Sequence, residues 1–338
     1  MRERVLLIAP KFLGYYQEIA NEITKLGYKV DYINDEPNDS NIYKAIARVN
    51  KKILSYSIHK YFNNIVLPQV ETISYNKILV IGGMTFSFTP NMIHVLRKLN
   101  KNAKFYLYQW DSERNLPYVT KIHKYFDHIF TFDRYDASFK PEVYKFLPLF
   151  YTNTYKKIGD MNVTSYKYDC MYVGTAHPRK YKEITQMSEK LNKVFKNQYI
   201  YQYIYQYMPS KLKYIYHKLF SPEYKHAKYS TFKTKKLSSK QMFELLQKSR
   251  CVLDAPQAGQ SGLTMRTIEC LGAKKKLITS NSDIINYDFY CTENIYIYDG
   301  DFDFNSVFFN KGYKNIDQNI YEKYSLRNWI KTIFEIRD

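Results

Sequence analysis

The sequence predicts an α/β protein built from two doubly wound, Rossmann-like domains, each with a parallel sheet. Three observations lead to this fold class. A chain of 338 residues is long enough for about two domains. Short β-rich runs alternate with helical patterns in two successive sets. Between the sets, the polar stretch TNTYKKIGDMNVTS interrupts the alternation. We therefore expect an N-terminal domain at 1–155, a second domain at 156–318 and a C-terminal helix at 319–338.

The first set alternates from the start of the chain. Its expected elements are, in order, RVLLIAP, a helix in YYQEIANEITKLG, YKVDYIND, a long mixed stretch through Asn63, KILVIGG, a helix opened by Thr89 and Pro90, KFYLYQW, a helix around 117–126, HIFTFDR and YKFLPLF. Ligands of such sheets bind beyond the carboxyl ends of the strands. The unusual residues at those ends are Lys11, Gly14, Gly82, Gly83, Asp111, Ser112 and Asp133.

The second set repeats the pattern. We expect YDCMYVGT, a helix from about Arg179 to Phe195, the strand NQYIYQYIY, a variable stretch, a helix at 238–249, CVLDAP, a helix at about 262–271, KLITSN and NIYIYDG. The apolar spacing in IYEKYSLRNWIKTIFEIRD predicts a terminal helix that packs on the rest of the molecule.

The segment from Val252 to Asn281 carries the most specific signal, because it predicts strand, glycine-containing loop, helix and strand. Pro256 ends the first strand, and two glycines follow before the helix. The free N–H groups and the macrodipole at the helix start favour an anion. The segment therefore predicts a phosphate site.

Arg266 and Glu269 stand three positions apart, on one face of that predicted helix. An arginine can hold a diphosphate with two hydrogen bonds, and a carboxylate one turn further on can accept from ribose hydroxyls. A surface ion pair on a packing helix would have the same spacing. The preceding loop favours a nucleotide site made of Gln260, Ser261, Gly262, Leu263, Thr264, Arg266 and Glu269.

A second loop with similar chemistry runs from Gly174 to Arg179, where the first strand of the second domain meets its helix. Glycine permits close approach of a ligand, and Arg179 could meet the same diphosphate. A plain strand-to-helix turn is the alternative. His177 could donate to a phosphate, or it could simply be exposed.

Chemistry on a hydroxyl acceptor needs a general base, which we expect in the first domain. Asp111, after KFYLYQW, is the first candidate, and Asp133 and Asp136 in FTFDRYDAS are the second. A carboxylate after a buried strand could instead cap the helix that follows. The Asp301-Phe302-Asp303 triplet resembles a metal-binding DxD motif, but a turn explains it equally well, so we assign no metal. We also assign no cofactor.

The net charge of +19 indicates an acidic partner. The segment from Lys211 to Lys240 contains nine lysines, and Glu223 is its single acidic residue. Tyrosines are frequent from Tyr199 onward. A solvated lysine face, an anionic membrane surface in contact with 199–240, and single-stranded nucleic acid all remain open. Scattered cysteines without CxxC spacing, the absence of a signal-peptide pattern and the absence of a long apolar run favour a cytoplasmic protein.

Four blocks resemble the GT-B glycosyltransferases of bacterial capsule and lipopolysaccharide synthesis. They are WDS at Trp110, FDHIFTFDRYD, YDCMYVGTAHPRKY and QSGLTMRTIECLGAKKKLITSN, and they span about half the chain. The resemblance implies two domains that face a central cleft, with a nucleotide-sugar donor held mainly by the second. A carboxylate placed like Glu269 would hold the ribose, and Arg179 and Arg266 the diphosphate. Ser261 occupies the place where retaining relatives have an earlier glutamate, which puts a retaining mechanism in doubt.

The sequence therefore predicts a metal-independent glycosyltransferase that extends a surface glycan, with a glycan or lipid-linked glycan as acceptor. Two alternatives remain. One is an enzyme that processes nucleotide sugars, such as a non-hydrolysing epimerase, and the other is a basic nucleic-acid-binding protein.

Overall fold

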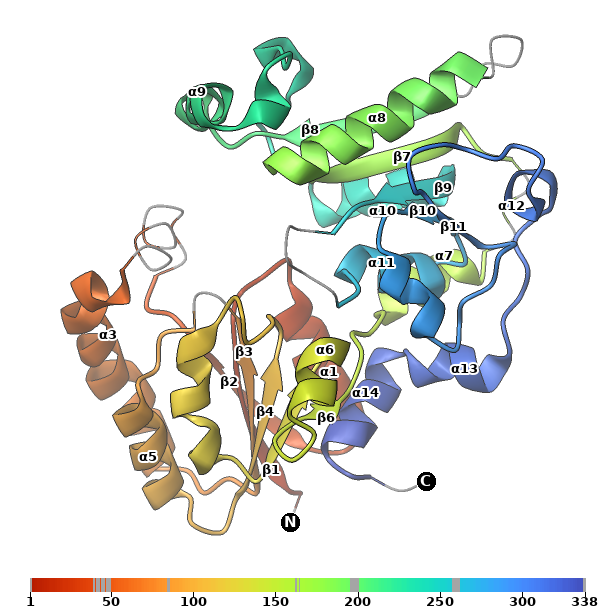
Figure 1. Ribbon diagram of the computed structural model, residues 1–338. Coiled ribbons are helices and arrows are strands. Elements are labelled where there is room, and N and C mark those ends of the chain that lie inside the picture. The colour runs from red at the N-terminus through yellow and green to blue at the C-terminus, as the bar shows by residue number, and fades with distance from the viewer. Residues whose placement is uncertain are drawn as a thin grey trace. The chain divides into compact units, whose positions relative to one another are not determined.

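The computed structural model describes residues 2–38, 40, 43, 46, 50–83, 86–161, 163, 165–194, 201–256 and 262–336 (Figure 1). Contacts divide the chain into two compact units. The first comprises Met1–Pro148 and Leu326–Asp338, and the second comprises Leu149–Ser325. Each unit has one parallel sheet, so the predicted fold class of two doubly wound α/β domains is confirmed.

The first unit contains a six-stranded sheet with the order β2-β1-β3-β4-β5-β6, and all neighbouring strands are parallel. Its strands are β1 (Arg4–Ala9), β2 (Lys29–Asn34), β3 (Lys77–Gly82), β4 (Lys104–Gln109), β5 (His128–Thr131) and β6 (Lys145–Phe146). The central strands are buried along almost their whole length, as expected for a parallel sheet covered on both faces.

Helices of the first unit are α1 (Tyr15–Lys25), α3 (Ser55–Tyr61), α4 (Leu67–Glu71), α5 (Pro90–Leu99), α6 (Arg134–Phe139) and α14 (Leu326–Ile333). The predicted start of α5 is confirmed, because the Thr89 hydroxyl accepts from the Met92 N–H and Pro90 occupies the first helical position.

The α-helix predicted around 117–126 is wrong. That segment forms two short 3₁₀ turns, Pro117–Lys121 and His123–Tyr125. The physical reason lies in the spacing of its apolar residues. Leu116, Val119 and Ile122 are all buried, and a repeat of three matches the 3₁₀ helix rather than the α-helix.

The second unit contains a five-stranded parallel sheet with the order β11-β10-β9-β7-β8. Its strands are β7 (Tyr168–Thr175), β8 (Gln202–Tyr207), β9 (Ser249–Asp254), β10 (Lys276–Thr279) and β11 (Ile295–Ile297). Its helices are α7 (Asn153–Gly159), α8 (Pro178–Val194), α9 (Lys211–Phe220), α10 (Ser239–Gln247), α11 (Met265–Gly272), α12 (Val307–Asn310) and α13 (Gln318–Lys323). The chain passes from β7 to β8 on one side and then continues to β9 on the other, so the topological switch point lies between β7 and β9.

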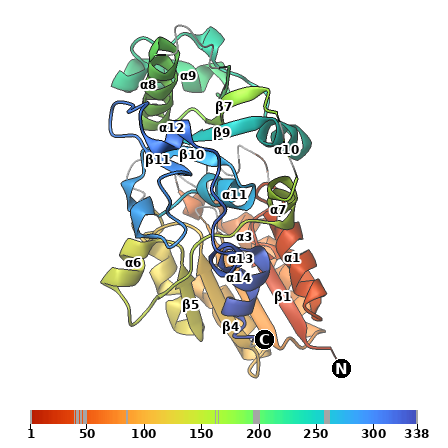
Figure 2. The same cartoon turned by 90° about the vertical axis from the view of Figure 1, so that its right-hand side faces the viewer.

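The predicted terminal helix is two helices. The first, α13, belongs to the second unit, whereas α14 packs on α1 of the first unit (Figure 2). Trp329 of α14 is buried, with its ring 4.7 Å from that of Tyr108 on β4.

Cys170, Cys251 and Cys270 are buried, Cys291 is half-buried, and all four are free thiols. Within the described ranges, no helix is both long enough and apolar enough to cross a bilayer.

Candidate functional site

The candidate site of the second unit is formed where β7 and β9 end. The loop after β7 leads into α8, and the loop after β9 leads into α11. These two strands flank the switch point, which is where open α/β sheets bind ligands. The structure therefore places the two loops singled out by the sequence on neighbouring strands, at the same edge of one sheet.

Asp254, the last residue of β9, connects this strand to the start of α11. Its buried carboxylate accepts hydrogen bonds from the Thr264 hydroxyl at 2.5 Å and from the Thr267 hydroxyl at 3.3 Å. The Lys180 ammonium, from the first turn of α8, lies 4.0 Å from the other carboxylate oxygen. One buried carboxylate thus fixes the beginnings of both helices.

Thr264 is the N-cap of α11, and its hydroxyl accepts from the Thr267 N–H at 3.3 Å. The predicted start of this helix at Gly262 is therefore wrong, because the cap places the first helical residue at Met265. Gly262 and Leu263 are buried residues of the loop that leads to the cap. Gln260 and Ser261 lie outside the described residues.

Arg266 and Glu269 form an ion pair, with Arg266 Nη1 2.8 Å from Glu269 Oε2. The sequence left a surface ion pair open as the alternative to a ligand site, but the pair is not on the surface. Only 4% of the Glu269 side chain and 19% of the Arg266 side chain are exposed. The guanidinium also lies 3.8 Å from the Met242 sulfur. These contacts hold both charged groups in fixed positions beside the start of α11.

Gly174, which the sequence places in the loop, is the next-to-last residue of β7, where packing requires a glycine. A Cβ at this position would lie 2.3 Å from the Tyr172 hydroxyl, so the glycine makes room for the tyrosine ring. That hydroxyl is buried and has no hydrogen-bond partner among the described residues. Burial raises its pKa, the Asp254 carboxylate raises it further, and Arg266 lowers it. Tyr172 therefore belongs to the same electrostatic environment as the α11 residues.

Arg179 lies in the first turn of α8, and its side chain is half exposed. Its Nε donates to Glu183 one turn further along at 2.6 Å, and Glu183 also accepts from the Ser280 hydroxyl just after β10. His177 is half-buried immediately before α8, where its carbonyl accepts from the Tyr181 N–H. The two carboxylates, Asp254 and Glu183, thus anchor neighbouring cationic side chains at this edge of the sheet.

The three candidate bases of the first unit have different surroundings. Asp136 on α6 is buried and accepts from the Glu113 N–H at 2.7 Å. Asp133 is buried and caps α6, because its carboxylate accepts from the N–H groups of Tyr135 at 2.9 Å and Asp136 at 3.3 Å. Asp111 is half-buried in the loop after β4 and approaches Gly83 after β3, where a Cβ would lie 3.9 Å from the carboxylate. The geometry thus gives Asp133 the capping role, whereas Asp111 lies where two strand ends meet.

Comparison with known proteins rests on structure. No protein-family model matches the chain, and no curated sequence is significantly similar to it. An α-glucosyltransferase in complex with UDP and a 13-mer DNA superposes with a TM-score of 0.57 at 14% identity, covering 98% of this chain and 90% of that one. HepE of Anabaena, in complex with UDP and glucose, gives 0.54 at 9% identity over 99% and 100%. The chain has the GT-B fold.

Sequence reasoning missed Asp254 and Tyr172 in the second domain of this GT-B chain. Asp254 was detectable, because it ends an apolar strand in the same way as Asp111 and Asp133 do. Tyr172 was also detectable in principle, since residues two apart on a strand share a face and place its ring beside Gly174. Asp301, of the DxD-like triplet, instead pairs with Lys190 at 3.3 Å. The described residues contain no group of three or more side chains that could bind a metal.

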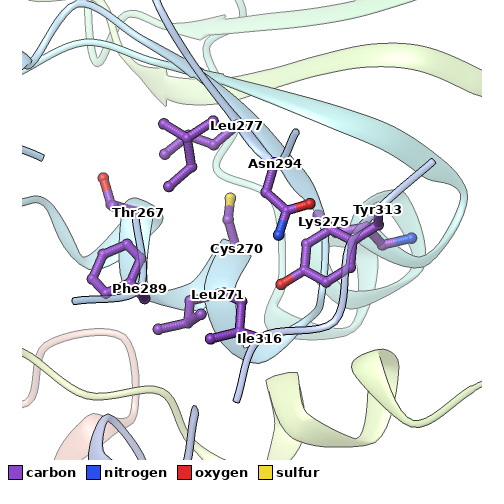
Figure 3. Close-up of a pocket in the computed structure, with 10 residues that line it drawn as sticks. Thr267, Cys270, Leu271, Lys275, Leu277, Phe289, Asn294, Tyr313 and Ile316 are labelled. Atoms are coloured by element: carbon purple, nitrogen blue, oxygen red, sulfur yellow. The ribbon is translucent and has the colours of Figure 1, made fainter. Parts of the chain in front are cut away.

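A small cavity adjoins α11 of the GT-B chain on another face (Figure 3). Thr267, Cys270 and Leu271 contribute from the helix. The remaining lining residues are Lys275, Leu277, Phe289, Asn294, Ile295, Tyr313 and Ile316. This lining is mostly apolar, and burial lowers the pKa of Lys275 to about 8. The cavity is therefore a packing feature of the helix, with chemistry unsuited to a diphosphate.

Proposed function

We propose that the protein is a glycosyltransferase of the hexosyltransferase type, which moves a sugar from a nucleotide-sugar donor to a hydroxyl of a growing surface glycan. The GT-B fold and the arrangement at the ends of β7 and β9 support this function. We further propose that the glycan belongs to a capsule, lipopolysaccharide or exopolysaccharide and is carried on a lipid. The enzyme would then work in the cytoplasm, at the inner face of the cell membrane.

The buried pair of Arg266 and Glu269 is the observation that carries the proposal. Two buried charges lose hydration, so an ion pair in this position is a poor way to stabilise a helix. A bound nucleotide would explain why both charged side chains are kept in this buried position. The diphosphate would attract the guanidinium, and the carboxylate would accept from the two ribose hydroxyls. Asp254, through Thr264 and Thr267, would keep the start of α11 in place for this exchange.

Stabilisation of the leaving nucleotide diphosphate would come from the two helix starts. The phosphates would meet the backbone N–H groups of Gly262, Leu263 and the first turn of α11. They would also meet the side chains of His177, just before α8, and Arg179, in its first turn. These dipoles and cations are already oriented toward the diphosphate before the bond to the sugar breaks. They can therefore stabilise the negative charge that develops on it without moving. Gly174 contributes indirectly, because it admits the Tyr172 ring next to these groups.

On the acceptor side, we propose Asp111 as the general base that takes the proton from the attacking hydroxyl. It lies beyond the end of a buried strand, next to a glycine loop. Burial and the carboxylates of Asp35 and Asp111 raise the pKa of the neighbouring Tyr118 hydroxyl. This assignment corresponds to an inverting transfer.

The donor assignment can be tested by thermal shift with UDP-, GDP-, ADP-, CMP- and dTDP-sugars. We expect one nucleotide class to stabilise the wild type and to lose most of this effect with Glu269→Gln. Glu22→Gln is the matched control, because 4% of the Glu22 side chain is exposed and it pairs with Arg327 at 3.2 Å, with both residues in the first unit. Absence of any nucleotide effect on the wild type, or an equal response of Glu269→Gln, would refute the assignment.

A nucleic-acid acceptor is the second candidate. The net charge of +19 and the DNA bound to the α-glucosyltransferase of similar fold favour it. Transfer of labelled sugar to DNA, with none to lipid-linked glycan, would support this alternative. Conversion of a nucleotide sugar without any acceptor would instead indicate the epimerase-like function.

A further inference from the structure

Helix α9 has an inner face that packs on the protein and an outer face that is exposed. On the inner face, Tyr214 donates to the Ala227 carbonyl at 2.9 Å, and its ring lies 5.8 Å from that of Phe232. Lys218 reaches back to the Tyr224, Lys225 and Ala227 carbonyls at 3.2, 2.6 and 3.1 Å. The inner face therefore holds α9 firmly against the segment that follows it.

The outer face carries a stripe of large apolar side chains. They recur at helical spacing, and their exposed fractions are 79% for Leu212, 41% for Ile215, 59% for Tyr216, 71% for Leu219 and 71% for Phe220. We call these five residues the α9 stripe. A helix of a soluble domain normally buries such a stripe. Exposed clusters of this kind mark contact with a partner or a membrane.

Positive charge is concentrated in α9 and in the segment that follows it. Besides Lys218, whose ammonium is bound on the inner face, the exposed lysines are Lys211, Lys225, Lys228, Lys233, Lys235, Lys236 and Lys240. Glu223 is the only acidic residue between Lys211 and Lys240. An apolar helical face bordered by lysines suits the interface of an anionic bilayer, where aliphatic groups enter the acyl region and ammonium groups meet headgroup phosphates.

The packing also connects α9 to the candidate donor site. Tyr224, in the turn after α9, donates to the Ala176 carbonyl at 2.6 Å, and its ring lies 4.7 Å from that of Tyr181 on α8. Ala176 belongs to the loop between β7 and α8. Within the second unit, Tyr214 on the inner face of α9 and Ala176 of the donor loop are thus parts of one packed cluster. Figure 1 shows α9 beside α8 and β8.

We propose that α9 is a membrane-docking helix, which lies in the plane of an anionic lipid surface with the α9 stripe inserted. A second copy of the chain fits less well, because a symmetric contact would bring the same lysines together. Nucleic acid would bind the lysines through its phosphates, but its bases stack on aromatic side chains and would not account for the exposed leucines and isoleucine. The inference agrees with a lipid-linked acceptor but does not rest on sugar transfer.

Sedimentation with lipid vesicles tests the proposal without donor or acceptor. The vesicles contain phosphatidylcholine alone, or phosphatidylcholine with about one quarter phosphatidylglycerol. We expect binding to the anionic vesicles only, weakened at least about tenfold by Leu219→Ser with Phe220→Ser. Raising NaCl from about 0.1 M to about 0.5 M should weaken binding as well. Both side chains are largely exposed, so the double variant should fold normally.

Tyr135→Ser with Phe139→Ser is the matched control. These residues form another exposed apolar pair, 63% and 68% exposed on α6, in a segment where Asp133, Asp136 and Glu142 offset the basic residues. Control binding should equal that of the wild type. The proposal is overturned by no binding to anionic vesicles, by equal loss in the control, or by a wild-type oligomer that the α9 variant dissociates. Oligonucleotide binding that is sensitive to the α9 variant overturns it too.

A second measurement reports the position of the helix. In a Phe220→Trp variant, anionic vesicles containing brominated acyl chains should quench the added fluorescence, whereas a variant with tryptophan at Phe139 should show no quenching. Quenching at position 220 supports insertion of the α9 stripe. Binding without quenching would show that only the lysines contact the surface and would overturn the proposed insertion.

Discussion

Arg266 Nη1 lies 2.8 Å from Glu269 Oε2, between the first two turns of α11, and both side chains are mostly buried. The pair places a flat cationic group and a carboxylate at the N-terminal end of one helix. A lysine at position 266 would keep the charge but lose the fixed fork of donors that matches a diphosphate.

We therefore expect Arg266→Lys to reduce the affinity for the preferred nucleotide diphosphate about tenfold, equivalent to about 1.4 kcal/mol. Calorimetric titration with UDP, GDP and ADP measures the change. Arg327→Lys, which alters an arginine paired with the buried Glu22 of the first unit, should bind like the wild type. Equal affinities of Arg266→Lys and the wild type would show that the guanidinium only supports the helix.

Much of this site could be read from the sequence, because its signals are local. The i,i+3 spacing of Arg266 and Glu269 and the strand before the loop depend only on neighbouring residues. The exact start of α11 depends on Thr264, which caps the helix while its hydroxyl is held by Asp254 ten positions earlier. Which residue caps the helix therefore depends on a tertiary contact. The pattern of glycines alone predicts a helix start that is too early.

Burial was harder to predict than position. An arginine and a glutamate three apart usually form a surface pair, and the burial of this one, in which the guanidinium contacts the Met242 sulfur, depends on tertiary packing. The segment after Leu116 shows the same limit. Its buried residues recur every three positions, as in the 3₁₀ turns found there, but the alternation of strands and helices in the surrounding sequence favoured an α-helix.

The Tyr172 hydroxyl provides a test in which stability and affinity change in opposite directions. Because it is buried without a described partner, Tyr172→Phe should leave the ligand-free protein as stable as the wild type or stabilise it by about 1 kcal/mol. If the hydroxyl meets the donor, nucleotide affinity should fall about fivefold or more. Denaturant unfolding and calorimetric titration measure the two effects.

Tyr106→Phe is the control for Tyr172→Phe, since the Tyr106 hydroxyl is buried without a described partner on β4 of the first unit. This variant should show the stability effect without the change in affinity. A purely structural Tyr172 would behave in the same way as the control.

Gly272 fixes the C-terminal end of α11 against Tyr151. A Cβ at position 272 would lie 2.5 Å from the Tyr151 Cβ, and Tyr151 is fully buried. Gly272→Ala should therefore lower the free energy of unfolding by about 1–3 kcal/mol, through overpacking. A Cβ at Gly312 meets nothing within 4 Å, so Gly312→Ala should change stability by less than about 0.5 kcal/mol. Similar unfolding midpoints for both variants would contradict the close packing of α11.

Asp136 on α6 should make stability depend on pH. Burial raises its pKa to about 6, and the Asp133 and Glu113 carboxylates raise it, whereas the Glu113 N–H and Lys140 oppose the shift. Because the folded-state pKa lies above the unfolded value, the protonated carboxyl stabilises the fold below about pH 4. This contribution is lost as the pH rises to about 6.

Asp136→Asn keeps an oxygen that can accept from the Glu113 N–H and removes the charge. Near neutral pH we expect the variant to be more stable than the wild type by about 1 kcal/mol, after allowance for solvent screening. The difference should vanish near pH 4. Urea unfolding across this range measures it, and a constant difference at every pH would exclude titration of Asp136 as the cause.

Asp111 and Asp133 can be separated as general bases by the same conservative change. Asparagine caps a helix about as well as aspartate, so Asp133→Asn should keep α6, the fold and the rate of transfer. Asp111→Asn should lower kcat about a hundredfold or more, because an amide cannot take the acceptor proton, while the thermal shift produced by the nucleotide stays unchanged. The measurement is kcat at saturating donor, with melting temperature recorded for both variants. A large loss of kcat in Asp133→Asn with unchanged melting would move the base to Asp133, and full activity of both variants would exclude either carboxylate from that role.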